Sequence, residues 1–207
     1  MKITTSRSLF EALDDRGSTA AERKAFDDEV WAQRGAEGAI LVTDLSGFTR
    51  VTKEHGIVQF LALFRKFQAL CGPTIEANGG QLLKQEADDL FGLFSNATQA
   101  ISSAKNMLEK LREHNASALP EEQIGLSVGI DFGQYIRLTD DAYGDPVNVA
   151  FKLGEDIANR NEIRIGKSAY EQVKDSRELL SAFDLQGPVS VEASGNALEH
   201  YILTLKN

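Results

Sequence analysis

The chain has 207 residues, of which 42% are hydrophobic and 26% charged, the composition of an ordinary soluble globular protein. Its formal net charge of −9 argues against a protein that binds the nucleic-acid backbone through clustered lysine and arginine. The single cysteine, Cys71, excludes an internal disulfide and a thiolate metal cage. With no apolar signal core at the start and no segment near the length of a membrane span, we expect a cytoplasmic protein.

The first 35 residues are polar, and we expect residues 1–35 to form a helical arm outside the main domain. Within them, AAERKAFDDEVWAQRG predicts a helix with Phe26, Val30 and Trp31 on one side. Trp31 is the only tryptophan, and we interpret it as a staple that holds the arm on the main domain rather than as a ligand platform.

Residues 36–207 are assigned to one main domain. Residues 39–44, AILVTD, predict a strand, and residues 56–80 predict a long helix or two helical pieces that end in an Asn-Gly-Gly turn. The core-facing positions of this helix are expected to be Val58, Leu61, Phe64, Leu70 and Ile75. Residues 81–94 hold two short apolar runs around a charged centre, which predicts a β-hairpin.

Further along, residues 96–116 predict a helix, and residues 124–138 predict a pair of strands around a turn at Asp131-Phe132-Gly133. The next helix is expected to begin with Asp145 as N-cap and Pro146 in the first helical position. Residues 162–173 predict a strand and a helix, and residues 198–205 a closing strand. This alternation predicts an α/β sandwich: one mixed sheet with helices packed mainly on one face.

Asp44 ends a run of apolar residues, and Gly47 allows the chain to turn three residues later. A carboxylate at this place offers oxygen ligands for a hard cation, and free N–H groups in the turn suit phosphate oxygens. An aspartate that ends a strand and is simply solvated is the alternative interpretation.

Three carboxylates, Glu86, Asp88 and Asp89, fall within four residues at the expected tip of the hairpin. They repel one another unless water or a cation screens them, so the tip is either a solvated turn or part of a cation site. If the tip lies beside the strand that carries Asp44, then Asp44 and Asp88 share one or two magnesium ions with substrate phosphates and water.

Asn148 and Lys152 lie four residues apart on one expected helix and so share a face. An amide and an ammonium one turn apart are suited to hydrogen-bond and neutralise an oxygen-rich transition state. An exposed polar pair with no function has the same spacing.

Taken in order, DLSGFT, GGQLLKQEADDLFGLF, LSVGIDFGQYIRLTDDAYGDPVNVAFKLGEDIA and EIRIGKSAYEQV resemble the catalytic domain of class III adenylyl and guanylyl cyclases. The resemblance covers roughly residues 38 to 205, and YGDPVNVAFKL is its most specific part. It implies a ferredoxin-like βαββαβ core with a mixed sheet and a catalytic site between two head-to-tail subunits of a homodimer. It also implies two metal ions, Mg²⁺ or Mn²⁺, which act on a bound nucleoside triphosphate.

By this resemblance, Asp44 and Asp88 are the metal ligands. The turn formed by Gly47, Phe48 and Thr49 falls where backbone amides of the family meet the phosphates of the nucleotide.

The resemblance also places Lys84 and Asp141 on the pair that reads the purine. A lysine donates to a ring nitrogen of adenine and an aspartate accepts from its 6-amino group, so the pair fits ATP. Asn148 falls on the asparagine that orients the ribose, and Lys152 on the arginine that stabilises the transition state. These four residues of one subunit would face the metal ligands of the other.

The sequence departs from the family at three places. Lys152 replaces an arginine and lacks its planar, bidentate fork. The turn before the second metal ligand reads Ala87-Asp88-Asp89 instead of Gly-Asp-Gly, and Glu192 and Ala193 stand where many members have Lys-Gly. The metal and purine positions are therefore kept, while the transition-state and phosphate positions are weakened.

Three functions are compatible with this pattern. The first is an adenylyl cyclase that converts ATP to 3′,5′-cyclic AMP and pyrophosphate in a homodimer. The second is a cyclase-like module that binds nucleotide or only dimerises and signals without turnover, and the third is a cyclase for another nucleotide. What regulates the protein is not encoded in any motif that we recognise.

Overall fold

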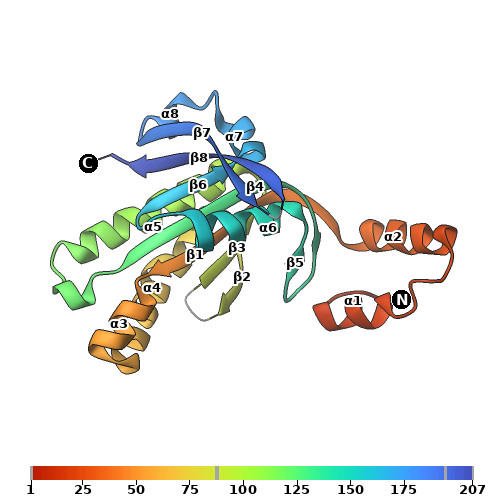
Figure 1. Ribbon diagram of the computed structural model, residues 1–207, viewed down its shortest axis with the longest axis horizontal. Coiled ribbons are helices and arrows are strands. Elements are labelled where there is room, and N and C mark those ends of the chain that lie inside the picture. The colour runs from red at the N-terminus through yellow and green to blue at the C-terminus, as the bar shows by residue number, and fades with distance from the viewer. Residues whose placement is uncertain (1, 87–88, 194, 207) are drawn as a thin grey trace.

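The computed structural model describes residues 2–86, 89–193 and 195–206. Across these residues one mixed sheet of eight strands has the order β2-β3-β1-β4-β6-β8-β7, with β5 paired to β4 (Figure 1). Its strands are β1 (Gly35–Ser46), β2 (Gln81–Glu86), β3 (Asp89–Phe94), β4 (Gly125–Arg137), β5 (Ala142–Tyr143), β6 (Glu162–Gly166), β7 (Phe183–Ala193) and β8 (Asn196–Leu205). The predicted α/β fold with one mixed sheet is confirmed.

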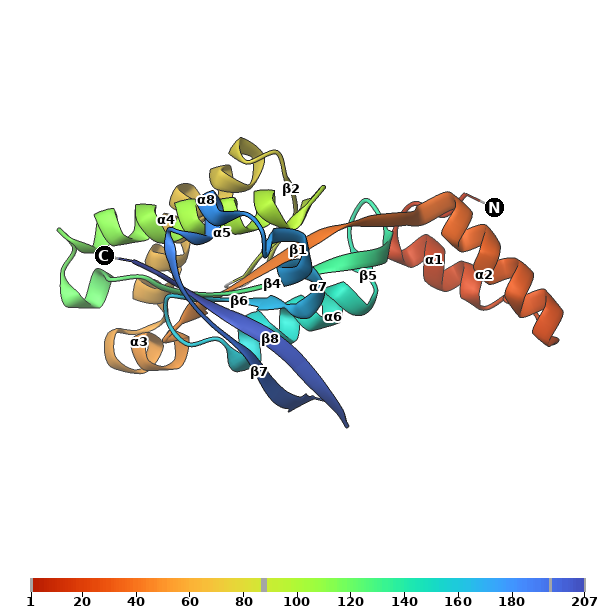
Figure 2. The same ribbon diagram turned by 90° about the horizontal axis from the view of Figure 1, so that it is seen from above.

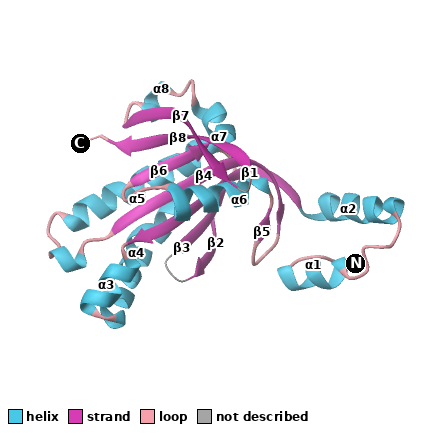
Figure 3. Ribbon diagram, in the orientation of Figure 1, coloured by secondary structure: helices cyan, strands magenta, loops and turns pink. Residues whose placement is uncertain are grey.

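Helices connect most of the strands (Figure 3). They are α1 (Ser6–Leu13), α2 (Ala20–Arg34), α3 (Phe48–His55), α4 (Ile57–Ala77), α5 (Ala97–Asn115), η1 (Pro120–Glu122), α6 (Asp145–Phe151), the π-helical segment η2 (Lys152–Ile157), α7 (Lys167–Val173) and α8 (Arg177–Leu180). Local side chains fix several helix starts: the Asn96 side chain accepts from the backbone N–H of Gln99 at 3.0 Å and caps α5. Within the described ranges, no helix is both long and apolar enough to cross a membrane.

The two faces of the sheet carry different parts of the core. In β1, Leu41 and Leu45 pack with α4, α5 and α7, whereas Ile40 and Val42 pack with α6 on the opposite face. Successive side chains of a strand point to opposite faces, so the alternation follows from the strand geometry. Helices therefore cover mainly one face, as predicted, and α6 covers part of the other.

The predicted turn at Asp131-Phe132-Gly133 is wrong, because β4 runs through it without a break. Asp131, Phe132 and Gly133 pair in unbroken antiparallel register with Ile40, Ala39 and Gly38 of β1. A local glycine signal predicted a turn, but the long pairing with β1 keeps the chain extended.

Of the two predicted alternatives for residues 56–80, one long helix or two helical pieces, the structure has the single helix α4, and the predicted glycine turn follows at Gly79 with φ +77°. Two of its expected core positions are wrong, because Val58 is 76% exposed and Leu61 is 50% exposed. The helix is apolar on more than one side near its start, so the sequence pattern left its orientation ambiguous, and Phe60 and Leu63 are buried instead.

The arm extends away from the sheet as a pair of helices, α1 and α2 (Figure 2). The predicted helix α2 is confirmed, but Trp31 is 45% exposed and is not part of the apolar cluster that joins the arm to the main domain. The contact with the main domain is instead an apolar cluster in which Ile3 and Val30 pack with Ile136 and Leu138 at the end of β4. The sequence analysis did not foresee α1, which is only eight residues long.

Asp131 is a buried carboxylate in the middle of the sheet. Its Oδ1 accepts a hydrogen bond from the backbone N–H of Ala169 at 3.3 Å, in the first turn of α7. Burial raises the pKa of Asp131 to about 6, and the hydrogen bonds from Phe132 and Ala169 oppose this shift.

Because the folded state raises the pKa of Asp131, the stability that this group contributes is complete below about pH 4 and is lost as the pH rises through about 6. Asp131→Asn keeps an acceptor for Ala169 but removes the titration. We expect the free energy of unfolding of the variant, relative to wild type, to rise by about 2 kcal/mol between pH 4 and 7. Urea denaturation across this range measures it.

The exposed Asp184→Asn is the matched control for the loss of one carboxylate. A difference between Asp131→Asn and wild type that stays constant with pH contradicts this account of Asp131.

Candidate active site

Asp44 lies at the end of β1, where the sequence analysis placed a metal ligand. It is half-buried and pairs with Ser127 of β4. By the alternation of the strand its side chain lies on the same face as Val42, the face that α6 covers. A carboxylate at a half-buried strand end fits one ligand of a hard cation.

The second predicted metal ligand, Asp88, lies outside the described residues. Among the residues that are described, no group of three or more His, Cys, Asp or Glu side chains is placed to hold a metal ion. The shared site of Asp44 and Asp88 therefore stays a prediction.

The predicted turn at Gly47 is present and begins α3. Gly47 has φ +98°, a conformation that strains any residue with a Cβ, and it is the N-cap of the helix. Since glycine has no side chain to accept from them, the first N–H groups of α3, at Phe48 and Thr49, are placed to donate to an anionic oxygen.

Two arginines that the sequence analysis did not single out lie near this turn. A Cβ on Gly125, the partner of Ser46, would come within 2.5 Å of the Arg160 guanidinium, so the glycine lets this side chain lie flat on β4. The pKa of Arg160 is lowered, first by burial and then by the positive charge of Arg50. The Arg50 guanidinium lies near Gly47. Arg160 comes much later in the chain, after β4, α6 and η2, so no local sequence pattern connects the two arginines.

The two predicted purine-reading residues meet in the structure. Lys84 Nζ lies 2.5 Å from Asp141 Oδ2, although the two residues are 57 positions apart in the chain. Their side chains are 27% and 19% exposed. Lys84 follows an irregularity in β2 after Leu82, and Asp141 lies in the turn between β4 and β5.

The helix that carries Asn148 and Lys152 begins one residue earlier than predicted. Its N-cap is Gly144, so Asp145 is the first helical residue rather than the cap. Asn148 is exposed, and Lys152 Nζ forms an ion pair with Asp156 Oδ2 at 2.8 Å. The α-helix changes to a π-helical segment at Lys152, an irregularity that is frequent at functional sites.

Glycines place this helix very close to the sheet. A Cβ on Gly129 of β4 would lie 2.0 Å from the Ala150 carbonyl oxygen and 2.4 Å from the Gly154 nitrogen. A Cβ on Gly154 would lie 3.1 Å from the carbonyl oxygen of Val42. The backbone of this helix therefore lies in direct contact with the backbone of the sheet. This contact fixes the distance of Asn148 and Lys152 from the sheet.

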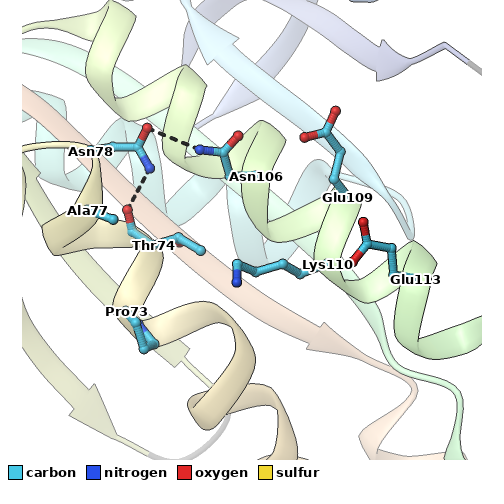
Figure 4. A pocket seen from close by; sticks show the side chains of 8 residues that line it. All are labelled: Pro73, Thr74, Ala77, Asn78, Asn106, Glu109, Lys110 and Glu113. Carbon is cyan, nitrogen blue, oxygen red and sulfur yellow. Dashed lines mark hydrogen bonds between the residues drawn. The ribbon is translucent and has the colours of Figure 1, made fainter.

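A separate cavity of about 380 Å³ lies between α4 and α5, on the face opposite to α6 (Figure 4). Asn78 and Asn106 are hydrogen-bonded there at 3.2 Å, and the carboxylates of Glu109 and Glu113 and the Lys110 ammonium line its rim. None of the predicted site residues lines this cavity.

The family described as "Adenylate and Guanylate cyclase catalytic domain" matches residues 30–204. An adenylate cyclase of Streptomyces coelicolor is 28% identical over 155 residues, which are 75% of this chain but only 38% of that enzyme. The chain thus spans less than half the length of this curated relative.

Solved structures share the fold. A cyclase from Silicibacter pomeroyi, described as adenylate/guanylate cyclase/hydrolase, has a TM-score of 0.71 at 22% identity over 83% of this chain and 98% of its own. The guanylyl cyclase Cya2 has a TM-score of 0.71 at 18% identity over 83% of this chain and 94% of its own. The family match extends over nearly the whole sheet, and the chain belongs to the class III adenylate and guanylate cyclase catalytic domains.

Proposed function

We propose that this chain is an adenylyl cyclase that converts ATP to 3′,5′-cyclic AMP and pyrophosphate. The observation that carries the proposal is the 2.5 Å contact between Lys84 and Asp141. An ammonium donates to a ring nitrogen of the purine and a carboxylate accepts from the 6-amino group of adenine. Guanine presents an oxygen acceptor at the same position, which a carboxylate repels.

The metal-binding part of the site would consist of Asp44 and Asp88, with Mg²⁺ or Mn²⁺. Bound divalent ions neutralise the triphosphate and make the ribose 3′-hydroxyl a better nucleophile. The N–H groups of Phe48 and Thr49 donate to the phosphates. Arg160, near this turn, supplies a positive charge in place of the lysine that many family members have at the position of Glu192.

The remaining residues act on the ribose and the reacting phosphate. Asn148 orients the ribose so that its 3′ oxygen attacks the α-phosphorus, the bond to pyrophosphate breaks, and the hydroxyl proton passes to solvent. Lys152 neutralises the charge that builds up on the transferred phosphoryl oxygens, for which its ion pair with Asp156 has to open.

The complete site requires two copies of the chain. Asp44 and Asp88 of one protomer would face Lys84, Asp141, Asn148 and Lys152 of its partner. In this arrangement residues 36–207 form the catalytic domain, and residues 1–35 are an arm outside it.

A non-catalytic cyclase-like module is the second candidate, and one observation favours it. Lys152 replaces an arginine and forms an ion pair with Asp156. The group proposed to stabilise the transition state therefore lacks a bidentate donor and already has a carboxylate partner. A cyclase for GTP is the third, since Cya2, a guanylyl cyclase, has the same fold.

The central test is to incubate the purified chain with ATP, GTP, CTP and UTP in turn, with Mg²⁺ and then Mn²⁺, and to identify products by mass spectrometry. We expect cyclic AMP from ATP, and we expect Asp44→Ala to abolish it because a metal ligand is lost. The exposed Asp175→Ala is the matched control and should retain the activity. A different cyclic nucleotide would overturn the purine assignment, and no product at dimeric concentrations would favour the non-catalytic module.

Lys152→Arg should raise kcat by about tenfold to a hundredfold, because the guanidinium supplies two parallel donors to the transition state where an ammonium supplies a point charge. Steady-state kinetics with ATP measures the change, and Lys66→Arg on the exposed side of α4 is the control. If kcat falls or does not change, the role given to Lys152 is wrong.

Arg160→Gln should weaken binding of inorganic pyrophosphate by about tenfold, the effect of losing one charged hydrogen-bond donor. Adenosine, which has no phosphate, should inhibit wild type and variant equally. Competition against ATP turnover measures both, with Arg65→Gln on α4 as control. Equal loss for both ligands would indicate a general structural role for Arg160.

A further inference from the structure

Asp141 accepts hydrogen bonds from three donors. Lys84 Nζ donates to Oδ2 at 2.5 Å, and the backbone N–H of Ala142 donates to Oδ1 at 2.8 Å. The third donor is the hydroxyl group of Tyr143, which lies 3.1 Å from Oδ2. Two of the three donors thus come from the residues that directly follow Asp141.

The same Tyr143 hydroxyl lies 3.1 Å from Oγ of Ser6 in the arm. A phenol has one proton, so when it donates to the Asp141 carboxylate it accepts from the Ser6 hydroxyl. The Tyr143 ring is half-buried and packs edge-on against Phe10, with the ring centroids 5.9 Å apart. Phe10 is also part of the arm, so the arm fixes both ends of the tyrosine side chain.

The arm is attached to the turn of Asp141 at further points. The backbone N–H of Ser6 donates to Asp140 Oδ1 at 2.8 Å. The backbone N–H and the hydroxyl of Thr139 both donate to the Thr4 carbonyl, at 2.9 and 3.0 Å. Residues 139 to 143 are therefore held by α1 and the residues before it.

We propose that Tyr143, held by Ser6, is a positioning residue that fixes the Asp141 carboxylate for recognition of the adenine 6-amino group. This inference rests on the proposed adenylyl cyclase function. It connects the arm, through Ser6, Tyr143 and Asp141, to the choice of nucleotide.

The need for such support follows from the ion pair. Lys84 Nζ lies 2.5 Å from Asp141 Oδ2, and in the proposed function it turns toward the purine ring when the nucleotide binds. Asp141 then loses its strongest donor, and Tyr143 and Ala142 are what keep the carboxylate in place. A carboxylate that is free to rotate discriminates less between an amino group and an oxygen at position 6.

Binding of 3′-deoxy-ATP and 3′-deoxy-GTP, which lack the attacking hydroxyl, tests this without turnover. In isothermal titration calorimetry with Mg²⁺, at concentrations where the protein is dimeric, we expect wild type to prefer the adenine nucleotide. Tyr143→Phe should lower the affinity for 3′-deoxy-ATP by about tenfold, the order of one hydrogen bond to a charged group, and leave 3′-deoxy-GTP unchanged. Ser6→Ala should act in the same direction and more weakly.

Tyr170→Phe is the matched control, because Tyr170 stacks on Tyr201 with centroids 3.7 Å apart and packs against the apolar cluster on the face opposite to α6. If wild type prefers the adenine nucleotide and Tyr143→Phe and Ser6→Ala keep the full preference, the positioning role is refuted and the proposed function stands. If wild type binds neither nucleotide, or both equally, the adenine-reading function is refuted together with the inference.

Discussion

The close contact of α6 and η2 with β4 is the constraint on which the arrangement of the site depends. Gly129 and Gly154 let the Ala150 carbonyl and the sheet backbone approach to a distance that any side chain would prevent. The distance of each residue of this helix from the sheet is therefore set by direct backbone contact. No compressible layer of side chains lies between them. The distances of Asn148 and Lys152 from the sheet are fixed in the same way. A methyl group at Gly129 would shift the helix and both side chains together.

The sheet separates structural from chemical roles. One face packs against α4, α5 and α7 around the larger apolar cluster, and the other carries α6 and the polar residues of the candidate site. Asp44 lies near the end of β1, Asp141 in the turn between β4 and β5, and Lys84 within β2, and all three are only partly exposed. Substitutions in the large cluster would act on stability, while those on the α6 face would act on the proposed nucleotide site.

The sequence predicted well what short-range patterns determine. The β1 strand, the hairpin of β2 and β3 and the α5 helix followed from the spacing of apolar residues and from turn signals. The orientation of α4 was wrong at Val58 and Leu61, because its apolar residues occupy more than one side and only tertiary packing selects among them. The contacts of Arg160 with Gly125 and of Tyr143 with Ser6 join distant segments, and no local pattern contains them.

The Lys84–Asp141 ion pair, which we propose reads the purine, also bears on how base selectivity would change in evolution. Both groups are mostly buried, so replacing either one alone removes the opposite charge that lies 2.5 Å from its partner in a poorly hydrated place. Only the second substitution removes the free-energy cost of the first, so the effects of substitutions at the two positions are strongly non-additive. A lineage would therefore exchange one purine for another through paired replacements, and intermediate sequences with a single change would be short-lived.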